Sequence, residues 1–274
     1  MYVDIAVVLE SYRDAGSHLQ VGCSIAKALT ARLVVLDVHG AKNPPIGLII
    51  GPESSVVAAE RSALQTVLAE VEQKKAFEEM VARSGISWVW RNLEVPLTSR
   101  VARHARRADL VLLFRPGRSA SIVDAARIVM ESGRPAILMP SDQRRSPLPF
   151  GRIVVAWNGS REASRAVHDA MPFLQQAERV VVATVPETSL FVEEHEPGPD
   201  ICDHLARHGV RSELHRPATT EQEPGAALLS VAAAASADLI VAGCYGHMRL
   251  TEFIFGGVSR TLLESATIPL LLSS

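Results

Sequence analysis

The chain has 274 residues, of which 47% are hydrophobic, so it can form one large domain or two ordinary domains with buried cores. A formal net charge of −2 argues against a general nucleic-acid binder or a membrane-surface binder, since both need a strongly basic surface. No apolar run approaches the roughly 20 residues that span a bilayer, and the N-terminus lacks the basic and apolar regions of a secretory signal. We therefore expect a cytoplasmic protein in which Cys23, Cys202 and Cys244 are reduced.

Short apolar runs alternate with amphipathic segments along the first half of the chain. The runs have the length of buried strands, and the segments between them have helical spacing of apolar residues. Residues 141–151 contain polar pairs and two prolines, which is typical of a linker. The predicted strands are 5–9, 33–36, 86–93, 110–113 and 136–139, and the predicted helices are 16–30, about 54–83, 98–108 and 121–132.

The same alternation restarts after the linker. Ala108-Asp109-Leu110 recurs as Ala237-Asp238-Leu239, and Gly117 falls on Gly246 at the same spacing, so the two halves are copies. We predict two α/β domains, residues 1–141 and 151–274, each with a parallel sheet covered by helices on both faces. The predicted strands of the second copy are 153–157, 180–185, 210–215, 239–242 and 268–272, and its predicted helices are 162–174, 203–208, 224–235 and 258–266.

A glycine-rich loop follows the strand predicted at 239–242. It opens with Gly243-Cys244-Tyr245-Gly246 and ends with Gly256-Gly257 at the start of a predicted helix, with Ser259 in the first turn. A helix N-terminus offers unpaired N–H groups and a partial positive charge, and bare glycine backbone lets an anion approach. The pattern predicts a phosphate cradle, with a plain strand-to-helix connection as the alternative. In the first copy Phe114 stands in the place of Gly243, so we expect no cradle there.

Ligands of parallel α/β sheets bind beyond the carboxyl ends of the strands, where the strand order reverses. In the second copy, the glycine-rich loop and the segment Trp157-Asn158-Gly159-Ser160 should meet at that point.

The spacing Gly-x2-Gly-x9-Gly, formed by Gly243, Gly246 and Gly256, resembles the nucleotide loop of the universal stress protein family. The segment from Val155 to Ala163 also resembles the opening of family members, and the duplication resembles tandem members. The resemblance implies a five-stranded parallel sheet in each copy, with the Rossmann-like fold of adenine nucleotide alpha hydrolases. It implies that the C-terminal copy binds ATP or a related adenine nucleotide, with or without Mg²⁺. The implied nucleotide-binding residues are Asn158 at the base or ribose, Val185 at the adenine, Gly243, Gly246, Gly256 and Gly257 at the phosphates, and Ser259 as a nearby hydroxyl.

Two residues depart from the family pattern. Asn158 stands where ATP-binding members usually have Asp, and Gly257 stands where the motif has Ser or Thr. Asn keeps an acceptor but loses the charge, and Gly257 removes a hydroxyl, so each departure should weaken nucleotide binding. The alternative hypothesis is an interaction or scaffold protein of the same fold whose motif has decayed. In the family, copies pair through the last strand, so we expect residues 136–139 and 268–272 to pair within the chain, and further dimerisation stays open.

Other features favour structural interpretations. No nucleophile–base pair and no Walker-type loop is present, so we expect no enzymatic activity beyond slow ATP hydrolysis. Cys202, His204 and His208 have the spacing of metal ligands on one helical face, but an exposed amphipathic helix explains them better. We interpret the arginines of 98–108 as a solvated face, Cys244 as an inert loop residue, Trp88 and Trp90 as sheet packing, and residues 193–196 as a solvated loop with a mobile lid as the alternative.

Overall fold

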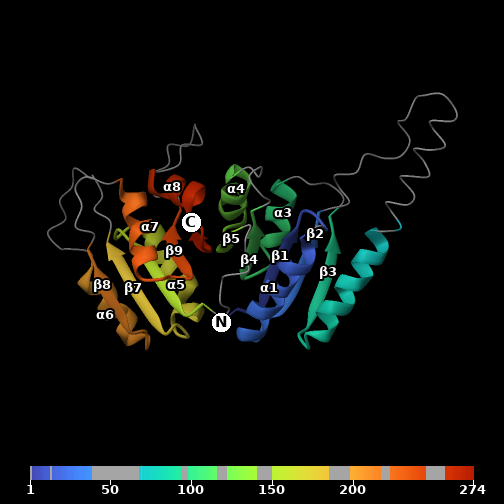
Figure 1. The fold of residues 1–274 in the computed structure, drawn as a ribbon, viewed down its shortest axis with the longest axis horizontal. Helices are drawn as coiled ribbons and strands as arrows, with labels where there is room; N and C mark the ends of the chain where they lie inside the picture. Colours follow the sequence, from blue (N-terminus) through green and yellow to red (C-terminus); the bar gives the residue numbers. More distant parts are fainter. Residues whose placement is uncertain are drawn as a thin grey trace, which may run out of the picture.

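The structure, a computed structural model, describes residues 2–12, 14–38, 68, 70–93, 98–115, 122–140, 150–184, 198–216, 223–244 and 257–274. Its strands form one sheet of ten, in the order β3-β2-β1-β4-β5-β10-β9-β6-β7-β8 (Figure 1). All neighbours in this sheet are parallel except β5 and β10. The predicted α/β fold, with a five-stranded parallel sheet in each half, is therefore confirmed. The strands are β1 (Asp4–Leu9), β2 (Arg32–Asp37), β3 (Trp88–Asn92), β4 (Leu110–Phe114), β5 (Ala136–Met139), β6 (Arg152–Trp157), β7 (Arg179–Thr184), β8 (Ser212–His215), β9 (Leu239–Gly243) and β10 (Leu270–Ser273).

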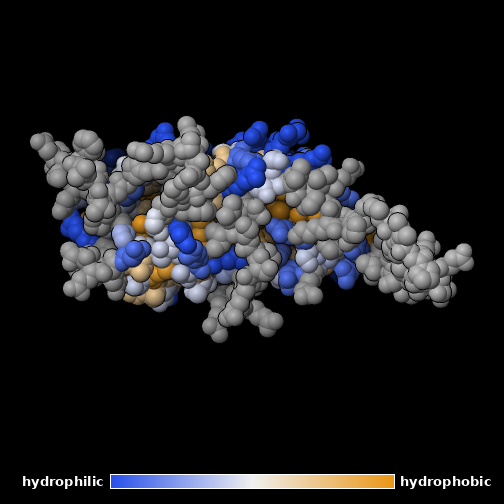
Figure 2. Space-filling model, turned by 90° about the horizontal axis from the view of Figure 1, so that it is seen from above, coloured by the Kyte–Doolittle hydropathy of each residue, from blue (hydrophilic) through white to orange (hydrophobic). Residues whose placement is uncertain are grey.

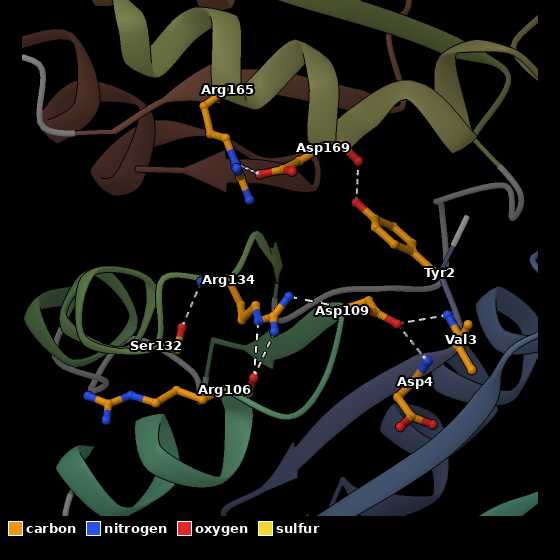
Figure 3. Close-up of polar contacts among 9 residues, drawn as sticks. All are labelled: Tyr2, Val3, Asp4, Arg106, Asp109, Ser132, Arg134, Arg165 and Asp169. Carbon is orange, nitrogen blue, oxygen red and sulfur yellow. Dashed lines mark hydrogen bonds and ion pairs between the residues drawn. The ribbon is translucent and has the colours of Figure 1, made fainter.

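The two halves join through their last strands. β5 and β10 pair antiparallel, with Leu138 opposite Leu270 and Ala136 opposite Leu272, and all four residues are buried. The predicted pairing of these strands within the chain is confirmed. A side chain also crosses the joint, since the Tyr2 hydroxyl donates a hydrogen bond to the Asp169 carbonyl oxygen (Figure 3). β5 and β10 run in opposite directions. The strands β1 and β4 therefore end on one side of the joint between the halves, and β6 and β9 end on the opposite side.

Helices cover both faces of the sheet. Buried apolar residues of α1, α5, α6 and the helical residues 70–83 form one core with the strands, and those of α3, α4, α7 and α8 form another on the opposite face. Each core therefore extends through both halves of the chain, which ties them into one folded body. The helices are α1 (Ala15–Ala28), α3 (Thr98–Ala105), α4 (Ile122–Ser132), α5 (Arg161–Leu174), α6 (Pro199–Arg207), α7 (Pro224–Ala234) and α8 (Gly257–Ser265).

Most element boundaries differ from the predicted ones by one to three residues at an end, and α6 differs more. The helix predicted at 203–208 begins at Pro199, in the first turn, directly after Gly198. Proline suits this position because its missing N–H has no partner within a helix there. Residues 141–149 of the predicted linker 141–151 and the start of the helix predicted at about 54–83 lie outside the described residues.

The surface has no extended apolar face among the residues that the structure describes. The large hydrophobic residues exposed there are Val3 before β1, Leu68 and Val71 in the helical segment that ends at residue 83, and Met130 in α4. Seen from above, hydrophilic residues lie in several places on the surface, with smaller hydrophobic patches between them (Figure 2). In this described part of the chain, no helix has the length and apolar character that crossing a bilayer requires.

Candidate functional site

The strand order of the C-terminal half reverses between β6 and β9. β6 pairs with β7 on one side and with β9 on the other, and Val155 lies opposite Val241. Asn158 follows β6 directly, and Gly243 is the last residue of β9, so both lie at the carboxyl ends of these adjacent strands. This is the position at which open parallel sheets bind ligands. Of the predicted nucleotide-binding residues, Asn158, Gly243, Gly257 and Ser259 are described, whereas Val185, Gly246 and Gly256 lie outside the described residues.

The turn between β6 and α5 is held by its own side chains. The Asn158 Oδ1 atom accepts a hydrogen bond from the Ser160 N–H at 3.1 Å, and Gly159 has a positive φ of 77° that favours glycine. Ser160 caps α5, because its Oγ atom accepts a hydrogen bond from the Ala163 N–H at 3.1 Å. The turn thus fixes the direction of Asn158 and the N-terminus of α5. Sequence reasoning missed Ser160 as a cap, although serine before a helix is a recognised signal.

Gly243 lies against the first turn of α5. A Cβ atom at this position would meet the Glu162 carbonyl carbon at 2.5 Å, the Ala163 nitrogen at 2.6 Å and the Glu162 carbonyl oxygen at 2.8 Å. All three are backbone atoms, which cannot give way as a flexible side chain can. Close packing between β9 and α5 therefore requires glycine here, whether or not a phosphate binds. The next residue, Cys244, is buried and its N–H donates to the Ser273 carbonyl oxygen, in line with an inert structural cysteine.

Gly257 is in a different environment at the N-terminus of α8. A Cβ atom there would have no atom within 4 Å among the described residues. No described part of another element therefore covers this side of Gly257, and an approaching anion needs such uncovered backbone. Ser259, two residues on, is buried, with only 8% of the residue exposed. The position of α8 is set by α7, since a Cβ atom at Gly225 would lie 2.5 Å from the Thr261 Cβ atom.

Sequence reasoning did not identify the exposed cation Arg161 as part of the candidate site at the ends of β6 and β9. Arg161, at the start of α5, is 91% exposed in its side chain and pairs with the buried Glu162 at 2.8 Å. The loop residues His247 and Arg249, which have cationic or ionisable side chains, lie outside the described residues. Arg161 is therefore the exposed cation that directly follows the Asn158–Ser160 turn.

The N-terminal half has bulky side chains at the corresponding positions. Phe114 ends β4 as Gly243 ends β9, and its ring stacks on His18 of α1, with centroids 3.8 Å apart. Burial lowers the pKa of His18 to about 4. The stacked rings of Phe114 and His18 thus lie between β4 and α1, at the position where Gly243 of β9 packs against α5 in the C-terminal half.

A second cluster in the N-terminal half surrounds Asp37, the last residue of β2. Its buried carboxylate accepts hydrogen bonds from the Tyr12 hydroxyl at 2.5 Å and from Trp90 Nε1 at 3.1 Å. Burial, together with the Asp37 carboxylate, raises the pKa of Tyr12. Trp88 and Trp90 both pack against the core, so their interpretation as sheet packing is confirmed. Sequence reasoning missed this cluster, because its members come from three separate segments.

The other candidates from the sequence do not form a site in the described residues. His204 and His208 are exposed with ring centroids 4.6 Å apart, and no group of three or more His, Cys, Asp or Glu side chains is placed to hold a metal ion within the described ranges. Arg100, Arg103 and Arg107 are exposed, as expected for a solvated face. Residues 193–196 lie outside the described residues.

A groove of about 1170 Å³ lies between α5, α6 and the N-terminal half. Its walls include Tyr2, Arg134, Arg165, His168 and His204. None of the four described nucleotide-binding candidates lines it, although Trp157, the last residue of β6, does.

Comparison with known proteins gives a family match and several structural matches. Residues 149–273 match the model of the universal stress protein family. The fold is similar to the crystal structure of a universal stress protein from Archaeoglobus fulgidus DSM 4304, at 16% identity and a TM-score of 0.66, with 98% of this chain and 96% of that chain covered. It is also similar to a putative universal stress protein from Pseudomonas aeruginosa UCBPP-PA14, at 16% identity and a TM-score of 0.61, with 99% and 93% covered. The comparison with curated proteins found no match. The structural likeness therefore shows the fold of both halves.

Proposed function

Because the C-terminal half of this chain belongs to the universal stress protein family, we propose that the protein is a stress-response module that binds ATP or a related adenine nucleotide in that half. The observation that carries the proposal is the open backbone of Gly257 at the N-terminus of α8. A helix N-terminus without a covering side chain suits a phosphate, because its N–H groups and its dipole both favour an anion.

The proposed arrangement places the nucleotide across the carboxyl ends of β6 and β9. Gly257 would contact the phosphates, together with Gly246 and Gly256 of the loop before it. Asn158, fixed by its hydrogen bond to Ser160, would meet the base or ribose. Val185, directly after β7, would meet the adenine, and Mg²⁺ would accompany the phosphates as a counter-ion. The bound state would change a surface that partners read.

A second candidate function, an interaction scaffold of the same fold, is favoured by two observations. Gly243 is required by its packing against Glu162 and Ala163, so it needs no phosphate to explain it. The Asn158 oxygen already accepts a hydrogen bond within its own turn. In this alternative the glycine spacing is a remnant, and the protein acts through its surfaces alone.

Mass spectrometry of small molecules released from the purified full-length protein separates the two candidates, followed by calorimetric titration with ATP, with and without magnesium. Nucleotide binding predicts a released adenine nucleotide or a measurable heat on titration. The absence of both, at millimolar ATP, would overturn the nucleotide proposal and leave the scaffold.

A further inference from the structure

Arg115 reaches from the N-terminal half to the C-terminus of α8. It directly follows β4, and its Nη1 atom donates to the Ala266 carbonyl oxygen at 2.9 Å. Its Nη2 atom donates to the Leu262 carbonyl oxygen at 3.5 Å. The guanidinium therefore contacts two carbonyl oxygens at the end of the helix whose other end carries Gly257.

The chemistry of this contact is that of a helix C-cap supplied from elsewhere in the chain. The last carbonyl oxygens of a helix lack partners within it and form the negative end of its dipole. The last turn of α8 has no basic residue of its own, so Arg115 supplies the cation.

Burial makes this contact important for the position of α8. Arg115 is half-buried, and burial lowers its pKa. No carboxylate of the described residues forms an ion pair with it, and its Nε atom is buried without a hydrogen-bond partner there. A partly desolvated cation needs compensation, and the α8 carbonyl oxygens provide it. Moving α8 away would leave this cation uncompensated, which opposes such a movement.

The direction of α8 connects this contact with the proposed phosphate site. The helix follows β9 of the C-terminal half and begins with Gly257. It ends beside Arg115, which follows β4 of the N-terminal half. In Figure 1, α8 and α4 are both seen above the joint between the halves.

We infer that Arg115 is a positioning residue for the phosphate site, so that nucleotide binding in the C-terminal half depends on the N-terminal half. The inference rests on the proposed function. Arg115 holds the C-terminus of α8, which places the open N–H groups of its first turn. By linkage, the free energy by which the Arg115 contact strengthens nucleotide binding equals the free energy by which a bound nucleotide strengthens the Arg115 contact.

Calorimetric ATP titration of the full chain tests the inference with Arg115→Gln and Arg115→Lys. We expect the Kd for ATP to rise roughly 5- to 10-fold in Arg115→Gln with unchanged stoichiometry, and less in Arg115→Lys, which keeps the charge. The matched control is Arg106→Gln, because Arg106 also donates to a helix carbonyl oxygen, that of Glu131 in α4, but not to α8. Arg106→Gln should bind ATP as the unchanged protein does. Equal Kd values for all four proteins would overturn the inference while leaving the proposed function intact.

Hydrogen exchange of the ligand-free protein tests the contact independently of ATP. In Arg115→Gln we expect faster exchange confined to residues 257–266, and in Arg106→Gln no change there. Unchanged exchange in α8 would overturn the inference, as would faster exchange across all strands of the C-terminal half, which would indicate general destabilisation. If the unchanged protein does not bind ATP, the proposed function fails, and the role in phosphate positioning fails with it.

Discussion

Asp109 and Asp238 make the same pair of backbone hydrogen bonds in the two halves of the sheet. Asp109 Oδ2 accepts from the N–H groups of Val3 and Asp4, at 2.8 and 3.0 Å (Figure 3). Asp238 accepts from the N–H groups of Gly151 and Arg152, at 2.9 and 3.0 Å. Each aspartate precedes one strand and holds the start of its neighbour, β1 or β6. The aspartate of the repeated Ala-Asp-Leu sequence thus aligns the start of the neighbouring strand in each half.

Asp238→Ala should destabilise the protein by about 1–3 kcal/mol, because it leaves two strand N–H groups without acceptors. Chemical unfolding in urea measures this change. Asp203→Ala is the control, since Asp203 is exposed on α6, and it should change the unfolding free energy by less than about 0.5 kcal/mol. Equal stability of the two variants would contradict a strand-aligning role for Asp238.

Gly243→Ala and Gly257→Ala should have opposite effects on stability. Gly243→Ala forces a methyl group into the α5 backbone and should cost about 1–3 kcal/mol. Gly257→Ala enters open space in the first turn of α8 and should stabilise by up to about 1 kcal/mol, through the better helix propensity of alanine. Urea unfolding of both variants checks this contrast. A fully stable Gly243→Ala protein would show that β9 and α5 are not in close contact.

Asn158→Asp should strengthen ATP binding without disturbing the fold. Aspartate can still accept the Ser160 N–H bond, and its charge makes stronger hydrogen bonds to ribose hydroxyls. We expect a Kd for ATP roughly 5-fold lower, which corresponds to about 1 kcal/mol. Calorimetry with magnesium present measures it, and urea unfolding provides the control for the fold. Weaker or unchanged binding would argue against placing Asn158 at the base or ribose.

His18 should make the protein less stable as the pH falls below about 6.5. Burial against Phe114 lowers its pKa to about 4 in the folded protein, although Asp14 acts in the opposite direction. The unfolded chain therefore takes up the proton first, and the stabilisation present above about pH 6.5 is lost progressively towards pH 4. The loss should be on the order of 2 kcal/mol.

The variant His18→Phe keeps a ring beside Phe114 but cannot titrate. The difference in unfolding free energy between His18→Phe and the unchanged protein should therefore grow between pH 7 and pH 4. A constant difference between His18→Phe and the unchanged protein over this range would show that His18 is not shielded from protonation.

The sequence was a good guide to the fold, because apolar runs and helical spacing are local signals. The runs that became β1, β4, β6 and β9 are bounded by polar residues or glycine, and the sheet contains them nearly as predicted. The pairing of the last strands was expected from the resemblance to the universal stress protein family, together with the apolar character of these strands. The start of α6 was missed, since Gly198-Pro199 reads equally as a turn.

The candidate site was less predictable, because its geometry depends on contacts between distant segments. A glycine at position 243 is expected both for a phosphate-binding loop and for close packing of a strand against a helix. Only the structure, which places the Glu162 backbone against Gly243, shows that close packing requires it. The bonds from Tyr12 and Trp90 to Asp37 join three segments with no shared motif. The contact of Arg115 with Ala266 similarly crosses the joint between the halves.

The most direct test of the account is an ATP titration that compares Gly246→Arg with Gly117→Arg, which changes the aligned glycine of the first copy. Calorimetry of the full chain should give one ATP per chain in the unchanged protein and in Gly117→Arg, and no binding in Gly246→Arg. Loss of binding in Gly117→Arg alone, or no binding in any of the three proteins, would contradict a nucleotide site at the glycine-rich loop of the C-terminal half.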